Sequence, residues 1–264
     1  MAAREKNLFA EERRRRILDT LASDSRVLVN DLSERFGVSS ATLRNDLREL
    51  EGAGLLRRTH GGAVSMESQV VEHSAEQALS EHKMAKELIG RTAAAQVHDG
   101  EIVLCDSGST TIEFVRALSG RRGLTIVTND YTIAAEVESL LTDCTTVLLG
   151  GVIRPGFHYT MGFPTIESLS HFSAPVAFIA ASAFSFERGF SVHTLDLASF
   201  KRTMILRAEK RVVLLDSSKF NLFTTVSFAD LEDIDEIITD AGIPDDVRTR
   251  IENMDNGPKL TIAE

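Results

Sequence analysis

From residue 81 onward, short apolar runs alternate with stretches of helical pattern. The apolar runs are IVLC, LTIVT, TTVLLGG, VAFIAASAF, RVVLLD, EIIT and KLTIA, and the helical stretches between them include 110–118, 131–141, 165–171 and 197–208. Strands that are apolar along their whole length are buried on both faces, and helices between them provide the crossovers of a parallel sheet. We therefore expect residues 81–264 to form an α/β sandwich built on a mostly parallel sheet.

Polar residues follow three of these apolar runs. The clusters are Asp106-Ser107-Gly108-Ser109-Thr110-Thr111, Thr128-Asn129-Asp130 and Gly150-Gly151. In parallel sheets, ligands bind at the carboxyl ends of the strands, where helix N-termini face the crevice. The first cluster can offer backbone N–H groups and hydroxyls to a phosphate, with Gly108 allowing close approach and Asp106 capping the turn or binding a sugar hydroxyl. A capped turn without any ligand is the alternative.

Two lysines can reach the same crevice. Lys201 lies in LASFKRTMI near the start of a helical stretch, and Lys219 lies in LLDSSKF just beyond the run that ends at Asp216. Either side chain suits a phosphate or hydroxyl partner, although an ordinary surface lysine is the alternative for each. The sequence contains neither Gly-x-x-x-x-Gly-Lys nor Gly-x-Gly-x-x-Gly, which argues against a nucleoside triphosphate or dinucleotide cofactor. The histidines show no metal spacing, so we expect neither a metal nor a cofactor.

The N-terminal segment has a different pattern. AEERRRRILDTLASD predicts a first helix with a basic entry, and VNDLSERFGVSSATLRNDLRELEGAGLL predicts a helix, a break at Gly37 and a second helix capped by Ser39 or Ser40. The second helix buries Leu43, Leu47 and Leu50 by its spacing. This order is typical of a helix-turn-helix unit.

The remaining face of that second helix carries hydrogen-bond donors. Arginine reads guanine, asparagine reads adenine, and hydroxyls at a helix N-terminus bind phosphates. After the helix, GLLRRTHGGAV predicts two short strands around a glycine turn, which is a small basic wing. The residues that we expect to contact DNA are Ser39, Ser40, Thr42, Arg44, Asn45, Arg48, Arg57, Arg58 and His60.

Charge is distributed unevenly along the chain. The net charge is −10 overall, but residues 1–64 carry +2 and the remainder −12. This asymmetry is typical of a nucleic-acid module joined to an acidic body. We predict a DNA-binding domain over 1–64, a linker over 65–80 that has no sustained apolar period, and a ligand-sensing domain over 81–264.

No apolar run approaches the roughly 20 residues of a membrane span, and no signal peptide is recognisable, so a soluble cytoplasmic protein without a membrane partner is expected.

The motifs together resemble a known family. VNDLSERFGVSSATLRNDLRELEGAGLLRRTHGGAV is similar to the winged helix-turn-helix of DeoR-family bacterial transcriptional regulators, with Asn45 where that family usually has a second arginine. DSGSTT, VTND, LGG, LLDSSKF and KRTMI are similar to the family's sensor domain, which is related in fold to ribose-5-phosphate isomerases; Ala180 replaces a usual glycine. The resemblance implies a phosphorylated sugar or related metabolite as effector, with Ser107 to Thr111 taking the phosphate.

The predicted function is therefore a repressor of a carbohydrate-metabolism operon that binds double-stranded DNA as a homo-oligomer, either a dimer or a tetramer. Residues expected at the effector are Asp106, Ser107, Gly108, Ser109, Thr110, Thr111, Thr128, Asn129, Gly150, Gly151, Lys201 and Lys219. An isomerase-type enzyme is one alternative, with Asp106, Glu187 and Asp196 as bases, but none has a recognisable partner and no catalytic residue is assigned. A DNA-binding protein without an effector is the other.

Overall fold

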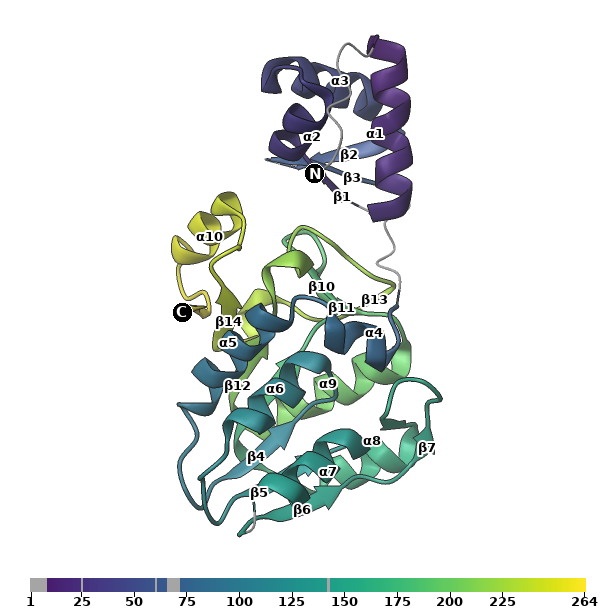
Figure 1. Cartoon of the computed structure of the whole chain (residues 1–264). Coiled ribbons are helices and arrows are strands. Elements are labelled where there is room, and N and C mark those ends of the chain that lie inside the picture. The colour runs from purple at the N-terminus through teal and green to yellow at the C-terminus, as the bar shows by residue number, and fades with distance from the viewer. Residues whose placement is uncertain (1–8, 25, 60, 66–71, 142) are drawn as a thin grey trace. The chain divides into compact units, whose positions relative to one another are not determined.

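The computed structural model describes residues 9–24, 26–59, 61–65, 72–141 and 143–264. The chain divides into two compact units, one up to residue 71 and one from residue 72. Elements of the first unit are α1 (Ala10–Asp24), β1 (Arg26–Leu28), α2 (Val29–Phe36), α3 (Ser40–Gly52), β2 (Leu56–Thr59) and β3 (Gly62–Ser65) (Figure 1). It is a winged helix-turn-helix, as the sequence predicts.

Apolar side chains from three helices and the wing form the core of the first unit. Ile17 and Leu21 of α1 pack with the leucines of α3 and with Phe36, the last residue of α2. Gly37 then ends α2 in the left-handed conformation, with φ of 66°. The wing lies on the strand β1, which the sequence pattern did not predict: a Cβ on Gly62 would come 1.8 Å from the Val27 carbonyl oxygen. Only glycine permits that approach.

The second unit is built on a seven-stranded sheet in which every neighbouring pair is parallel. Its order is β15 (Lys259–Ala263), β14 (Glu236–Asp240), β12 (Ala208–Leu214), β9 (Ala174–Ala180), β4 (Ile102–Cys105), β5 (Thr125–Thr128) and β6 (Thr145–Leu148). All carboxyl ends therefore lie along one edge of this sheet. The prediction of an α/β sandwich on a parallel sheet is confirmed.

Helices cover both faces of the sheet (Figure 1). On one face, α5 (Lys83–Ala94), α6 (Ser109–Ala117) and α7 (Tyr131–Leu140) bury the alternate strand residues Val103 and Cys105. On the other face, α8 (Phe163–Ser170), α9 (Leu195–Arg207) and α10 (Asp245–Glu252) belong to the cluster that buries Leu104. Because successive side chains of a strand point to opposite faces of the sheet, a continuous apolar run supplies apolar side chains to both faces.

Smaller elements complete this unit. The strands β10 (Ala183–Ser185), β11 (Gly189–Val192) and β13 (Val226–Ala229) form an antiparallel sheet, and β7 (Val152–Ile153) pairs with β8 (Thr160–Met161). The remaining elements are α4 (Ala75–Ser80) and the single 3-10 turns η1 (Ser217–Lys219) and η2 (Leu231–Asp233).

The boundary between the units differs from the expected linker 65–80. Residues 75–80 form α4, which begins with a capping box between Ser74 and Gln77 and belongs to the second unit. Leu79 of this helix packs against the apolar cluster beneath α5 and α6. A single turn and a half is too short to show an apolar period, which explains why the pattern suggested a connector. Residues 66–71 lie outside the described part.

In the described ranges, no helix is long and apolar enough to cross a membrane. The same ranges hold no group of three or more His, Cys, Asp and Glu side chains placed to bind a metal ion.

At the amino ends of the strands, Glu236 is buried but has four hydrogen-bond donors. Lys210, Lys259, Gln96 and Thr261 reach its two carboxylate oxygens at 2.6–3.1 Å. Burial alone would raise the pKa of Glu236, but the donors, Lys210 foremost, outweigh it and lower the pKa to about 2. The carboxylate therefore joins β12, β14 and β15 at this edge.

We predict that Glu236→Gln lowers the free energy of unfolding at pH 7 by about 2 kcal/mol, because hydrogen bonds to a charged group are lost. Because the pKa of Glu236 is depressed in the folded protein, its carboxylate stabilises the fold at pH values above the ordinary pKa of 4.5. This stabilisation is lost as the pH falls toward about 2. Urea unfolding of the wild type and the variant at pH 7 and pH 3 measures this. A difference between the two proteins that stays constant over that range would contradict the assignment.

Candidate functional site

The helix α3 presents its polar side chains on one exposed face. Ser39 caps the helix, and its Oγ accepts a hydrogen bond from the Thr42 backbone N–H at 3.2 Å. Arg44, Asn45 and Arg48 are exposed, with Arg48 Nη1 donating to Asn45 Oδ1 at 2.8 Å. The apolar residues of the helix fill the core beneath, so this face is left with arginine, amide and hydroxyl donors.

Other residues expected at DNA lie close to α3 or in the wing. Ser40 is the first residue of α3 and is half-buried, while Arg57 lies in β2. Arg58 folds back onto α3, where its Nε lies 2.7 Å from Glu51 Oε2. This hydrogen bond lowers the pKa of the Glu51 carboxyl, so part of the Arg58 charge is neutralised within the unit. His60 lies outside the described residues.

Arg13 and Asp46 form a buried ion pair that the sequence pattern did not predict. Arg13 is buried, and its Nε and Nη2 donate to the two oxygens of Asp46 at 2.5 and 3.0 Å. The sequence pattern suggested a uniformly basic entry to α1, but Arg13 points inward and fastens α1 to α3. Asp46 lies beside Leu43, Leu47 and Leu50 on the buried face of α3, and an acidic residue at such a position is a signal of a buried partner.

In the second unit, the predicted polar clusters meet at the carboxyl edge of the sheet. Cys105 pairs with Thr128 in the register of β4 and β5, so Asp106 and Asn129 follow neighbouring strands at the same level. Asp106 and Asn129 are both buried. The first two predicted clusters therefore lie at the ends of neighbouring strands, as the sequence pattern indicates.

Asp106 and Lys201 form a buried ion pair, although they lie 95 positions apart in the chain. Asp106 Oδ2 receives the Lys201 ammonium and also accepts the Ala180 backbone N–H at 2.9 Å. Burial raises the pKa of the Asp106 carboxyl, and Lys201 acts against that rise. Lys201 was expected to meet a ligand directly; here it is held by Asp106, and Asp106 joins β4, β9 and α9 rather than capping the turn.

Asp106 Oδ1 and Asn129 Oδ1, which directly follow β4 and β5, are buried oxygens that accept no hydrogen bond from any described residue. The other end of the Asn129 amide is engaged, because its Nδ2 donates to the Thr160 carbonyl at 2.8 Å. A buried acceptor left without a donor costs about 1–3 kcal/mol. A molecule with hydroxyl or amine donors bound at this edge would remove that cost.

The N-terminus of α6 opens at the same edge, directly after Asp106. Gly108 is its N-cap with φ of 155°, and a Cβ there would come 3.0 Å from the Ala180 side chain. Ser107 and Thr110 are buried and Ser109 is half-buried. Thr111 differs from the expectation, because it is fully buried and its Oγ1 donates to the Gly108 carbonyl at 2.8 Å. It supports the loop instead of lining it.

The second cluster surrounds the start of α7. Thr128 is buried, and its Oγ1 accepts the Asp130 backbone N–H at 3.1 Å. Asp130 caps α7 by accepting the backbone N–H groups of Thr132 and Ile133. Burial raises the pKa of Asp130 to about 6, against the effect of those two hydrogen bonds.

The remaining predicted residues lie at the ends of β6 and β12. Gly150 and Gly151 are exposed; the Gly150 carbonyl accepts the Thr165 hydroxyl at 2.8 Å, and a Cβ on Gly151 would come 2.1 Å from that hydroxyl. Their role there is to allow packing against α8. Lys219 is half-buried in the turn η1, immediately after the end of β12.

Lys86 is a buried cation that the sequence reasoning missed. Its Nζ donates to the carbonyls of Ala78 and Glu81, at the end of α4, at 2.5 and 2.7 Å. Burial lowers the pKa of Lys86, partly offset by the charge of Asp216, while Lys219 lowers it further. Lys86 shares a helix face with the buried Ile89, Gly90 and Ala93, and a lysine in such an apolar stripe was the available signal.

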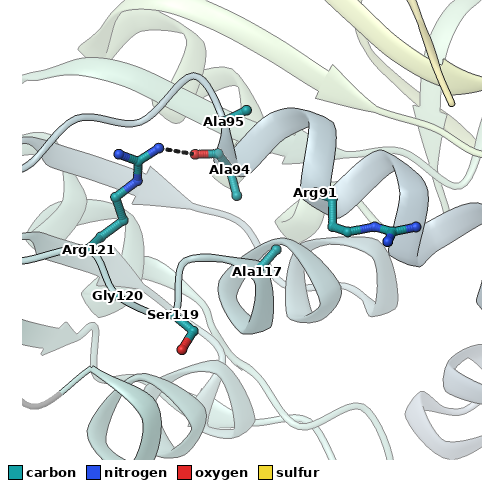
Figure 2. Close-up of a pocket in the computed structure, with 7 residues that line it drawn as sticks. All are labelled: Arg91, Ala94, Ala95, Ala117, Ser119, Gly120 and Arg121. Carbon is teal, nitrogen blue, oxygen red and sulfur yellow. Dashed lines mark hydrogen bonds between the residues drawn. The ribbon is translucent and has the colours of Figure 1, made fainter.

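A shallow cavity of about 330 Å³ lies away from this edge (Figure 2). It is lined by residues that end α5 and α6 and begin the following loop, namely Arg91, Ala94, Ala95, Ala117, Ser119, Gly120 and Arg121. Arg121 donates to the Ala94 carbonyl at 3.4 Å, and Arg91 extends away from it (Figure 2). Because α6 starts at the carboxyl edge of the sheet, its last turn lies toward the opposite edge. The cavity is therefore separate from the polar clusters.

Two family models match the chain. The DeoR-like helix-turn-helix domain matches residues 13–69, and the DeoR C terminal sensor domain matches residues 81–241. Similar proteins include the HTH-type transcriptional regulator GlpR of Haloferax volcanii, which is 35% identical and covers 93% of this chain and 96% of that protein.

Two further relatives are named repressors. The transcriptional repressor AccR of Agrobacterium fabrum is 31% identical, covering 92% of this chain and 93% of its own length. The HTH-type transcriptional repressor GlcR of Bacillus subtilis is also 31% identical, covering 88% and 89%. Ribose 5-phosphate isomerase A of Methanocaldococcus jannaschii aligns with 53% of this chain and 55% of its own, at 16% identity and a TM-score of 0.39. A score that low says nothing about what this chain does.

We predict that Asp106→Asn lowers the free energy of unfolding by about 3–5 kcal/mol, because it leaves the buried Lys201 ammonium without its counter-charge. The double variant Asp106→Asn with Lys201→Met removes both charges and should recover about 2 kcal/mol or more of that loss. Urea unfolding of the four proteins measures the coupling. Strictly additive effects would show that the two side chains are not a pair in solution.

Proposed function

The chain belongs to the DeoR family of transcriptional regulators, and on that basis we propose that it is a repressor whose operator binding is controlled by a phosphorylated sugar or a related metabolite. As a member of this family it is a DNA-binding regulator rather than an enzyme. Repression is supported by two relatives that are named repressors. The observation that carries the effector proposal is the pair of unpartnered buried oxygens beside the N-terminus of α6.

The DNA-binding surface of the proposal is the exposed face of α3. Arg44 and Arg48 can read guanine through paired hydrogen bonds, and Asn45 can read adenine. Ser39, Ser40 and Thr42 surround the helix N-terminus, where hydroxyls and backbone N–H groups hold phosphates. Arg57 and Arg58 in β2 supply further phosphate contacts, with Arg58 already shared with Glu51, and His60 follows them in the sequence.

The proposed effector site suits a ligand that carries both an anionic group and hydroxyl groups. The N-terminus of α6 supplies backbone N–H donors to the anion, and the hydroxyls of Ser107, Ser109 and Thr110 lie in its first turn or just before it. Asp106 Oδ1 and Asn129 Oδ1 are acceptors, which a phosphate cannot satisfy but a sugar hydroxyl can. Gly108, Thr111, Thr128, Gly150, Gly151 and Lys201 shape or brace this edge, and Lys219 adds a positive charge after β12.

In this proposal the protein binds its operator as a homo-oligomer, either a dimer or a tetramer. One recognition helix covers only half of a two-fold symmetric operator, so two copies are needed to engage both half-sites. The effector changes repression only to the extent that it binds the DNA-competent and incompetent states with different affinity.

We predict that Arg44→Ala weakens operator binding by about 1–3 kcal/mol, because it removes one base-reading side chain. DNA selected by this protein from a randomised library, titrated at fixed salt, measures the loss. Arg248→Ala, which removes an exposed arginine from α10 in the second unit, is the matched control and should leave binding unchanged. Equal losses for both variants would mean that α3 acts through charge alone.

We predict that Ser109→Ala with Thr110→Ala weakens effector binding at least about tenfold, because two hydroxyl donors to a charged phosphate are lost. Alanine is the best helix former, so α6 is retained. Thermal shift with a panel of phosphorylated sugars measures this, with Ser119→Ala in the separate cavity as control. DNA binding by the double variant should equal that of the wild type.

Two outcomes of that panel would redirect the assignment. If no phosphorylated sugar raises the melting temperature of the wild type, the protein is a DNA-binding regulator without this class of effector. Turnover of ribose 5-phosphate in a coupled assay would overturn the non-enzymatic assignment.

A further inference from the structure

The hairpin of residues 152–161, which contains β7 and β8, contacts two separate places in the second unit. Its returning strand lies against the candidate effector site at the ends of β5 and β6. Its loop lies against the first residues of the unit, which directly follow residues 66–71.

At the effector site, the returning half of the hairpin is held by several hydrogen bonds, including two from the Thr160 hydroxyl to the Leu149 and Asn129 carbonyls at 2.6 and 3.2 Å. Asn129 Nδ2 donates to the Thr160 carbonyl at 2.8 Å, and the Thr160 N–H donates back to the Asn129 carbonyl at 2.9 Å. The Tyr131 N–H donates to the His158 carbonyl at 3.0 Å, and Thr132 Oγ1 lies 3.1 Å from His158 Nδ1. The hairpin is therefore in direct contact with Asn129 and with the first turn of α7.

At its other end, the hairpin holds the start of the second unit. Two hydrogen bonds join Arg154 to Glu72. Arg154 Nη1 donates to Glu72 Oε1 and Nη2 donates to Oε2, both at 2.5 Å. The Ala75 N–H donates to the Gly156 carbonyl at 2.9 Å. Glu72 and Ala75 precede or begin α4, so this contact fixes where the chain enters the unit.

Arg154 also connects the two ends. Its Nη1 donates to the Tyr159 hydroxyl at 2.6 Å, and its guanidinium lies 3.8 Å from the centre of the Phe157 ring. Tyr159 is buried and forms a backbone bridge with Asp130 at the start of α7. The Arg154 and Glu72 side chains are 18% and 23% exposed, so their ion pair is better shielded than a surface pair.

His158 shows that this hairpin is held under constraint. Its φ is 64°, a left-handed conformation that costs a residue other than glycine about 1–2 kcal/mol. The contacts of its carbonyl and ring with Tyr131 and Thr132 maintain that conformation. These contacts tie the strained residue to the strand ends, so a change there that loosens them would relieve the strain.

We propose that the hairpin of residues 152–161 couples the effector site to the segment that enters the sensor unit, with Arg154 as the positioning residue. The inference rests on the proposed function, because it describes how occupation of that site is communicated. A ligand that engages Asn129 Oδ1 shifts the amide that holds Thr160. The shift passes through Tyr159 and Arg154 to Glu72, at the end of the segment that leads from the DNA-binding unit.

The test is a double-variant cycle that needs no effector. Asn129→Ala removes the contact at the strand edge and Arg154→Met removes the grip on Glu72. Both, singly and together, are measured in the full chain. One readout is hydrogen–deuterium exchange of peptides covering residues 72–80, where the Ala75 N–H reports directly; the other is the Kd for DNA selected from a randomised library.

Each single variant should speed exchange in 72–80 by at least about fivefold, the factor expected for loss of one hydrogen bond. Each should also change the Kd for DNA by at least about threefold, and the double variant should go no further than the larger single effect. Val137→Ala in the core of α7 controls for general destabilisation, and Arg248→Met controls for loss of one positive charge. Both controls should leave exchange in 72–80 and DNA binding unchanged.

Exchange in 72–80 that is unaffected by Asn129→Ala would overturn the proposal, as would additive effects of the two variants on either readout. A Kd unaffected by Arg154→Met would also overturn it, because the entry segment would then be irrelevant to DNA binding. These outcomes are independent of the sugar-phosphate panel. If that panel fails while the cycle is non-additive, the effector assignment is wrong and the coupling stands.

Discussion

The buried pair of Asp106 and Lys201 is the interaction on which the sensor unit depends. An isolated charge in such a place costs several kcal/mol, so neither side chain is stable there without the other. Asp106 follows β4, Lys201 lies in α9, and the Ala180 N–H on the same carboxylate ends β9. A single carboxyl group therefore sets the relative positions of two strands and a helix from the opposite face of the sheet. The α6 N-terminus starts from that fixed point.

The DNA-binding unit uses the same device on a smaller scale. Arg13 and Asp46 tie α1 to α3 through two hydrogen bonds in a buried setting. Because Asp46 faces inward, its neighbours Arg44, Asn45 and Arg48 face outward. The orientation of α3 thus depends on a buried arginine of α1. Arginine suits this role because its fork matches both carboxylate oxygens.

Local patterns were sufficient for the architecture and insufficient for the pairings. Apolar periodicity predicted the parallel sheet and the helix-turn-helix, because burial on one or two faces leaves a repeating signature. It also predicted that Asp106 and Asn129 share an edge, since strand ends meet in a parallel sheet.

The partner of Lys201 was missed because it is 95 residues away, and the partner of Arg154 is 82 residues away. Lys86 and Arg13 were missed because the burial of a long charged side chain is decided by what packs over it. The helix α4 carried a readable capping box at Ser74 and Gln77 that the apolar period did not reveal.

The uniform direction of the seven strands has a genetic consequence. Substitutions at the carboxyl edge that leave the Asp106–Lys201 pair intact, such as those in the first turn of α6, should yield regulators that accumulate normally but respond abnormally. Substitutions at the amino edge, where Glu236 gathers four donors, should lower the amount of regulator and leave the response of each surviving molecule intact. In a screen for altered regulation, the position of a mutation along the strand direction would then separate the two phenotypes before any protein is purified.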